Sequence, residues 1–299
     1  MLDIGSQYPM DRQSDPTGFL ARARLHQSRF RAERLKVPCG RFGNYLTEAD
    51  ARKGLNFFAG FGIREAVRER YPSFNRNVYA NLLRSEHVPF NFFIPLNTDD
   101  AFRRKVFSAW LGFEIKQVDE VRIEHAPLPR GEFLNDRTSF DAYVEYEDEA
   151  GLRGLVGIEV KYTELPYPLG KGSKEDRDIL DVGSPYYRVM ASSGIYREGW
   201  GKGLLRDEHR QLWRDQLLGE SILQRFRERY AYATLMVIHP EGNKHVTTAC
   251  ASYSRYLLHP EHTFKALTYE QVFADLRTHA TSGFFLPWID HLTERYIVP

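Results

Sequence analysis

Two alternating segments joined by a turn constrain the fold of this chain more than any other feature. Apolar and polar side chains alternate in residues 138–147 (TSFDAYVEYE) and again in residues 154–164 (GLVGIEVKYTE). Residues 148–151 (DEAG) carry a turn signal between them. The pattern predicts an antiparallel hairpin. With the turn centred near residue 150, Asp141 faces Glu159 across it.

The segments that flank this hairpin predict a mixed sheet. Residues 206–230 have the apolar spacing of a long helix, and an apolar strand signal follows at 232–240. A helix between two parallel strands would form a right-handed βαβ unit. A weaker strand is expected at 118–125, a buried connector at 90–96 and an irregular region at 165–205. Further helices are expected at 19–36, 63–71, 78–85, 99–113, 246–258, 269–280 and 284–297.

The order of these elements places the chain in the α/β class, with a central mixed β-sheet flanked by helices. Residues 1–18 are polar and are expected to form an N-terminal arm. Residues 19–299 are expected to form a single domain. Its core would cover about 78–240, with helical extensions at 19–77 and 241–299.

The composition is that of an ordinary globular protein. Hydrophobic residues make up 42% of the chain and aromatic residues 14%, which excludes a disordered chain. No apolar stretch is long enough to cross a membrane, and the first fifteen residues lack a secretory signal. Cys39 and Cys250 are isolated, which argues against a disulfide framework or a cysteine zinc site. We therefore expect no membrane partner and a cytoplasmic location.

Chemistry is expected on the polar side of the hairpin. Glu159 and Lys161 are two residues apart, so they point the same way, and the expected register adds Asp141. Two carboxylates suit Mg²⁺, and a lysine beside them can orient a water or stabilise a phosphoryl group. The alternative is the ordinary solvent face of an antiparallel pair. The apolar run at 155–162 favours a central strand, where an unpaired Glu and Lys would be costly to bury.

These residues resemble a known family. Phe140-Asp141, then seventeen residues, then Glu159-Val160-Lys161 and a following crossover look like the PD-(D/E)XK, or restriction-endonuclease-like, superfamily. Residues 154–164, 81–96 and 211–223 are similar to a bacterial branch of it. The superfamily name expects Pro before the Asp, where this chain has Phe140. The resemblance implies a restriction-endonuclease-like core.

The resemblance also implies a Mg²⁺-dependent nuclease, with Mn²⁺ able to substitute. Asp141 and Glu159 would bind the metal, the backbone carbonyl of Val160 would be a third ligand, and Lys161 would activate the water. An acid from a preceding helix often completes such a site. The candidates here are Glu86, where that branch would have Gln, and Glu65. A solvated helix acid is the alternative for both.

Four residues are candidates for nucleic-acid binding. Arg24 and Arg31 belong to the basic segment at 19–36, whose alternative is a solvated or partner-facing helix. Gln211 and Arg214 belong to the crossover helix, which packs beside the site in this fold. Arg214 can contact a phosphate, or it can form a salt bridge within the protein.

The sequence leads to one function and two alternatives. We expect a cytoplasmic bacterial endonuclease that hydrolyses DNA phosphodiester bonds, with a homodimer needed to cut both strands. A non-catalytic nucleic-acid-binding or scaffold protein that retains the fold is the first alternative. A metal-dependent enzyme acting on another phosphorylated substrate is the second. The net charge of +1 favours none of them.

Overall fold

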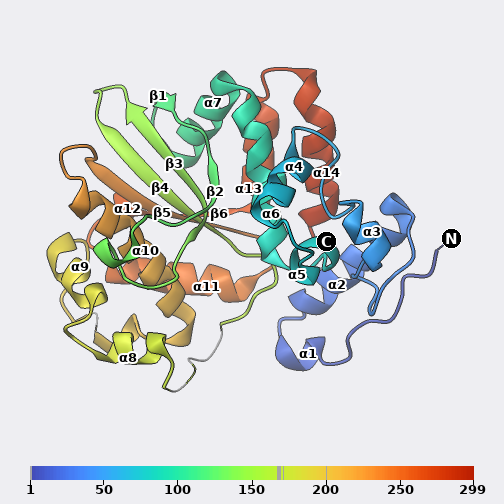
Figure 1. Cartoon of the computed structure of the whole chain (residues 1–299), viewed down its shortest axis with the longest axis horizontal. Coiled ribbons are helices and arrows are strands. Elements are labelled where there is room, and N and C mark those ends of the chain that lie inside the picture. Colours follow the sequence, from blue (N-terminus) through green and yellow to red (C-terminus); the bar gives the residue numbers. More distant parts are fainter. Residues whose placement is uncertain (1, 167–169, 171, 200) are drawn as a thin grey trace.

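A six-stranded mixed sheet lies at the centre of the molecule, with helices on both faces (Figure 1). The computed structural model describes residues 2–166, 170, 172–199 and 201–299. The strands run in the order β1-β3-β4-β5-β6, and β2 also pairs with β3. Their bounds are Ile115–Val118 (β1), Arg122–His125 (β2), Phe140–Asp148 (β3), Arg153–Val160 (β4), Tyr232–His239 (β5) and Phe264–Thr268 (β6).

The helices of the described residues divide into three groups along the chain. Those before the sheet are α1 (Asp11–Ser14), α2 (Phe19–Arg29), α3 (Glu48–Arg52), α4 (Ile63–Arg70), α5 (Arg76–Ala80), α6 (Val88–Phe93) and α7 (Asp100–Leu111). Those between β4 and β5 are α8 (Lys174–Leu180), α9 (Pro185–Ser193) and α10 (Asp207–Arg225). Those after β5 are α11 (Lys244–Tyr253), α12 (Pro260–Thr263), α13 (Tyr269–His279) and α14 (Leu286–Tyr296). None of the described helices is long and apolar enough to cross a membrane.

The expected hairpin is present as β3 and β4. Ala142 pairs with Ile158 and the strands are antiparallel, so the register brings Asp141 opposite Glu159 as predicted. Alternation along β3 predicts that Phe140 shares a face with Ala142 and Val144, but its side chain lies on the opposite face of the sheet. Phe140 packs with Tyr143, because the absence of a side chain at Gly157 leaves room for its ring. A Cβ at Gly157 would lie 2.2 Å from that ring.

The crossover from β4 to β5 is also confirmed. Helix α10 packs on the two strands, and β5 runs parallel to β4. Strand β6 is not predicted from the sequence; it adds a second parallel pair at the edge of the sheet. Two helices, α8 and α9, lie where an irregular region was expected. The expected strand at 118–125 is instead two short strands, β1 and β2, both paired with β3.

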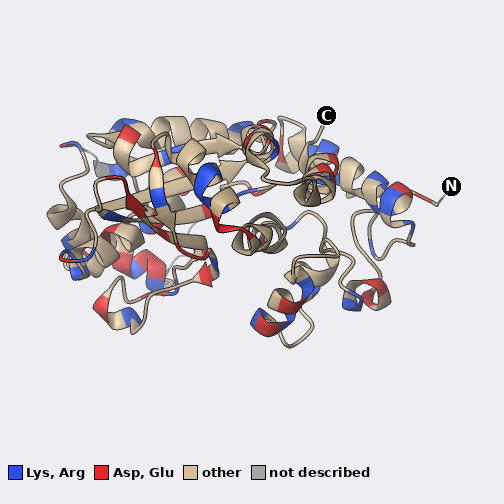
Figure 2. Ribbon diagram, turned by 90° about the horizontal axis from the view of Figure 1, so that it is seen from above, with Lys and Arg blue, Asp and Glu red and all other residues tan. Residues whose placement is uncertain are grey.

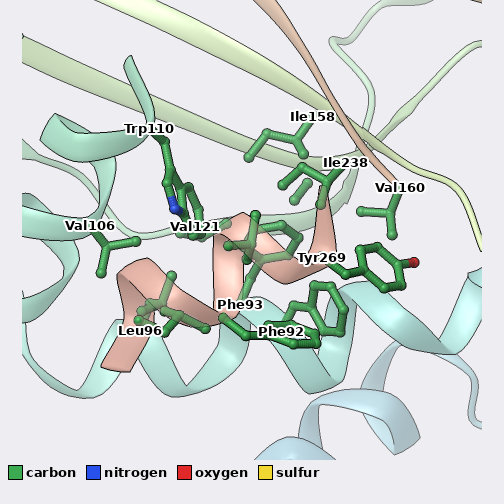
Figure 3. Packing of buried hydrophobic residues seen from close by; sticks show 14 of the residues in the cluster. Phe92, Phe93, Leu96, Val106, Trp110, Val121, Ile158, Val160, Ile238 and Tyr269 are labelled. Atoms are coloured by element: carbon green, nitrogen blue, oxygen red, sulfur yellow. The ribbon is translucent and has the colours of Figure 1, made fainter. Parts of the chain in front are cut away.

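Helices α6, α7, α13 and α14 cover the face of the sheet opposite α10. Figure 3 shows Phe92 and Phe93 of α6 and Trp110 of α7 packed with Tyr269 beneath Ile158 of β4. Residues 90–96 are buried for the most part, as expected, but most of them are helical, so the expectation of a connector is wrong. Every residue of α6 is buried, so its sequence shows no polar face by which a helix could be recognised.

The N-terminal residues are tied to the rest of the molecule. Asp15 is buried, accepts a hydrogen bond from the Leu20 N–H at 2.8 Å, and pairs with His245 at 3.0 Å. The side chain of Gln27 in α2 donates to the hydroxyl of Tyr162 at 2.7 Å. These contacts fix the helices before the sheet beside the segment that follows β4.

Candidate active site

The three residues predicted to carry chemistry lie in one cleft of about 500 Å³. It opens where β3 begins and β4 ends, and Asp141, Glu159 and Lys161 line it together with Gln211 of α10. Lys161 follows the last residue of β4, but its N–H still bonds to the carbonyl of Ile238 at 2.9 Å. The strand alternation therefore continues to Lys161 and keeps it on the same face as Glu159.

Asp141 is held by the strand opposite. Its Oδ2 accepts a hydrogen bond from the Val160 N–H at 2.7 Å. Burial and the neighbouring Glu159 raise the pKa of Asp141 well above its ordinary value, although the Val160 N–H and Lys161 favour the charged form. The carboxyl is therefore costly to ionise without a further cation beside it.

Glu159, Lys161 and Gln211 form a closed hydrogen-bonded triangle. Lys161 Nζ lies 2.7 Å from Glu159 Oε1 and 2.6 Å from Gln211 Oε1. The amide Nε2 of Gln211 in turn donates to Glu159 Oε1 at 2.6 Å. Burial alone would lower the pKa of Lys161, but Glu159 and Glu164 outweigh it and raise that pKa. Lys161 is therefore a cation here, able to donate hydrogen bonds and unable to accept a proton.

Gln211 lies beside the site, as expected for the crossover helix, but its side chain bonds within the site. The sequence made it a candidate for nucleic-acid binding, whereas its amide bonds to Glu159 and Lys161. Asp215 lies one turn further along α10, buried, with no hydrogen-bond partner for Oδ2 among the described residues. Burial and Glu159 raise the pKa of Asp215 well above its ordinary value. The sequence analysis did not single out Asp215; its position beside the site follows from how α10 crosses the sheet.

The two candidate helix acids have different positions. Glu86 lines the same cleft, and Arg84 holds both of its carboxylate oxygens. Glu65 lies outside the cleft on α4, where its side chain is 72% exposed and pairs with Arg68 at 3.5 Å. Glu65 does not line the cleft that holds Asp141, so the expectation that it completes the site is wrong.

Three of the four nucleic-acid candidates are structural. Arg31 is fully buried and donates to the carbonyls of Gly43, Val37 and Asp3. Arg24 binds Asp11 through two nitrogens and leaves little surface exposed. Arg24 and Arg31 are thus used inside the protein, and basic and acidic residues are interspersed along the chain (Figure 2).

Arg214 forms the salt bridge that was its alternative role. Its guanidinium lies 2.8 Å from Glu175 and 3.1 Å from Asp136, and its side chain is 14% exposed. Burial would lower the pKa of Arg214, but Tyr186 and these acids raise it. A phosphate would have to displace two carboxylates to reach it.

The donor set suits a hard divalent cation. Two carboxylates, Asp141 and Glu159, and the carbonyl of Val160 are oxygen ligands, and Mg²⁺ keeps several waters when it binds so few protein groups. No group of three or more His, Cys, Asp or Glu with metal-binding geometry occurs among the described residues. A bound ion would therefore rely on these oxygens and on water or substrate. Burial and Glu159 raise the pKa of Asp141 despite the nearby Lys161, so a bound cation would favour its charged form.

The fold and this acid–acid–lysine cleft define a class of metal-dependent nucleases. A profile of the PD-(D/E)XK nuclease superfamily matches residues 13–298, nearly the whole chain, and the chain belongs to this superfamily. The family expectation and the α/β fold class are therefore confirmed. The superfamily consists in general of phosphodiester-hydrolysing nucleases that typically use divalent metals. Comparison with curated proteins and with solved structures finds no significant match.

Proposed function

We propose that this protein is a Mg²⁺-dependent endonuclease that hydrolyses phosphodiester bonds in DNA, with Mn²⁺ able to replace Mg²⁺. The observation that carries the proposal is the meeting of Asp141, Glu159 and Lys161 in one cleft. Superfamily membership supports nuclease chemistry, and the proposal adds the substrate and the ion. A cytoplasmic location belongs to the proposal and rests on the two free cysteines.

Each residue of the cleft has a role in this proposal. Asp141, Glu159 and the Val160 carbonyl hold the ion, which supplies Lewis acidity to the phosphoryl group and a more acidic water. The protonated Lys161 donates hydrogen bonds to the attacking water or to a phosphoryl oxygen, where negative charge develops. Gln211 fixes Lys161 and Glu159 relative to each other, so that both are positioned before substrate arrives.

A plasmid-nicking assay with Mg²⁺ and EDTA arms tests the proposal. Supercoiled plasmid should become nicked with Mg²⁺ or Mn²⁺ and stay intact in EDTA. Binding of DNA without cleavage in any metal would instead indicate a non-catalytic nucleic-acid-binding protein. Cleavage of RNA alone, or of another phosphorylated compound alone, would contradict the choice of DNA.

Cleavage of both strands is proposed to need two copies of the chain. The cleft holds one set of Asp141, Glu159 and Lys161, and one such set attacks one phosphodiester at a time. The opposite strand is antiparallel, so a second site related by a two-fold axis is the simplest way to reach it. Linear product should then rise more steeply than first order in protein, after a nicked form. A strictly monomeric protein that linearises plasmid without a nicked form would contradict this.

A further inference from the structure

Arg84 is a half-exposed cation at the wall of the active-site cleft. Its Nε donates to Glu86 Oε2 at 2.9 Å, and its Nη2 also contacts Glu86. No described residue accepts a hydrogen bond from Nη1, and the side chain is 43% exposed. A guanidinium has five N–H donors in a fixed fork, so Arg84 keeps free donors after binding Glu86.

The turn that carries Arg84 is fastened to the chain just after Lys161. Glu164 accepts a hydrogen bond from the Ser85 N–H at 2.9 Å through one oxygen and from the Tyr162 N–H at 2.7 Å through the other. The hydroxyl of Thr163 donates to the carbonyl of Leu83 at 3.1 Å. Arg84 is therefore held at a fixed position relative to Lys161, although more than seventy residues separate them in the sequence.

The balance of charge in the cleft makes this position important. Six acids line the cleft, and they would repel a phosphodiester: Glu86, Asp141, Glu159, Glu164, Asp207 and Glu208. The positively charged or titratable groups facing them are Arg84, Lys161 and His245. Lys161 is bound by Glu159 and Gln211, and His245 lies 3.0 Å from Asp15. Arg84 is thus the cation of this wall that still has N–H groups available to a ligand.

We propose, resting on the nuclease function above, that Arg84 binds a phosphate of the nucleic-acid substrate beside the metal-binding carboxylates. Glu86 is then the positioning residue for Arg84. This differs from the metal-ligand role that the sequence suggested for Glu86. Both oxygens of Glu86 already accept hydrogen bonds from Arg84, so metal binding there would break the pair.

The first test measures binding and cleavage of a fluorescein-labelled DNA duplex. Arg84→Ala should raise the Kd in EDTA roughly tenfold, as expected for one charge-assisted contact. It should also lower the salt slope of binding by about one unit. In single-turnover cleavage with Mg²⁺ it should raise the half-saturating protein concentration more than it lowers the maximal rate. Arg84→Lys should recover part of the affinity, and Arg68→Ala, which removes an exposed arginine outside the cleft, should resemble wild type.

The second test separates the two roles of Glu86 by calorimetry with Mn²⁺ alone. Glu86→Gln should bind Mn²⁺ as wild type does. A metal ligand would instead lose Mn²⁺ affinity about tenfold or more, and that result would overturn the positioning role. Wild-type Kd and salt slope in a folded Arg84→Ala variant would overturn the phosphate contact. Wild type that neither binds nor cleaves DNA would overturn the proposed function itself.

Discussion

The Val160 N–H donates a 2.7 Å hydrogen bond to Oδ2 of Asp141, so the first carboxylate of the site is anchored by the strand that carries the second. This contact links β3 and β4 at the point where the cleft opens. It also keeps Asp141 close to Glu159 despite their like charges. The site is therefore formed by the hairpin itself, at a cost in stability when no cation is present.

Asp141→Asn should stabilise the metal-free protein. The pKa of Asp141 is raised, so its contribution to stability is present below its ordinary pKa and lost as pH rises through the raised value. At neutral pH the Asn variant should have a higher melting temperature in EDTA, with a smaller difference at pH 4, and it should not nick plasmid. A lower melting temperature at neutral pH would contradict the argument.

Gln211→Ala should reduce the cleavage rate about 10- to 100-fold, because Gln211 orients both Glu159 and Lys161. The maximal single-turnover rate should fall more than the DNA affinity. Gln224→Ala, near the other end of α10, removes contacts with the Ser192 side chain and the Val189 carbonyl and serves as the matched control. An unchanged rate for Gln211→Ala would remove the amide from the mechanism.

The contribution of Glu220 to the free energy of unfolding should fall as pH rises. Burial raises its pKa to about 8, so its contribution to stability is present below its ordinary value of 4.5 and lost as pH rises through about 8. The free energy of unfolding of Glu220→Gln relative to wild type should therefore increase between pH 5 and pH 9. Denaturant melts at both pH values measure this, with the exposed Glu228→Gln as control. Equal differences at both pH values would be inconsistent with a buried neutral carboxyl.

Arg31→Ala should lower the free energy of unfolding by about 2–4 kcal/mol. It should leave the salt slope of DNA binding unchanged. Arg31 is fully buried, and its loss would leave the carbonyls of Gly43, Val37 and Asp3 without a donor. Arg29→Ala removes an exposed arginine two residues away and should change stability by less than about 0.5 kcal/mol. A reduced salt slope with unchanged stability for Arg31→Ala would restore the nucleic-acid role expected from the sequence.

The hairpin and its register could be predicted from the sequence because two local signals agree. Strand alternation fixes the faces, and the turn at 148–151 fixes the pairing, which together place Asp141 opposite Glu159. The same reasoning misplaced Phe140, since the space above Gly157 exists only once the strands are paired. Strand alternation therefore predicts the face of a side chain only where the paired strand leaves no unusual space for it.

Three features depend on tertiary packing and could not be predicted from the sequence. Charge spacing in residues 19–36 could not show that Arg31 faces the protein interior, where backbone carbonyls replace water. The contact of Gln211 with Lys161 depends on the angle at which α10 crosses the sheet, and no local pattern encodes that angle. The segment at 88–93 is buried on every side, so it lacks the exposed polar face by which a helical period is recognised.

The central claim is that Asp141, Glu159 and Lys161 form a metal-dependent phosphodiesterase site, and one measurement tests it most directly. The rate of plasmid nicking is compared for wild type and Lys161→Ala in Mg²⁺ and in EDTA, with the melting curves of both proteins recorded in parallel. We predict nicking only by wild type in Mg²⁺, with cooperative unfolding of both proteins. Equal Mg²⁺-dependent nicking by the folded Lys161→Ala variant, or nicking by wild type in EDTA, would contradict the account.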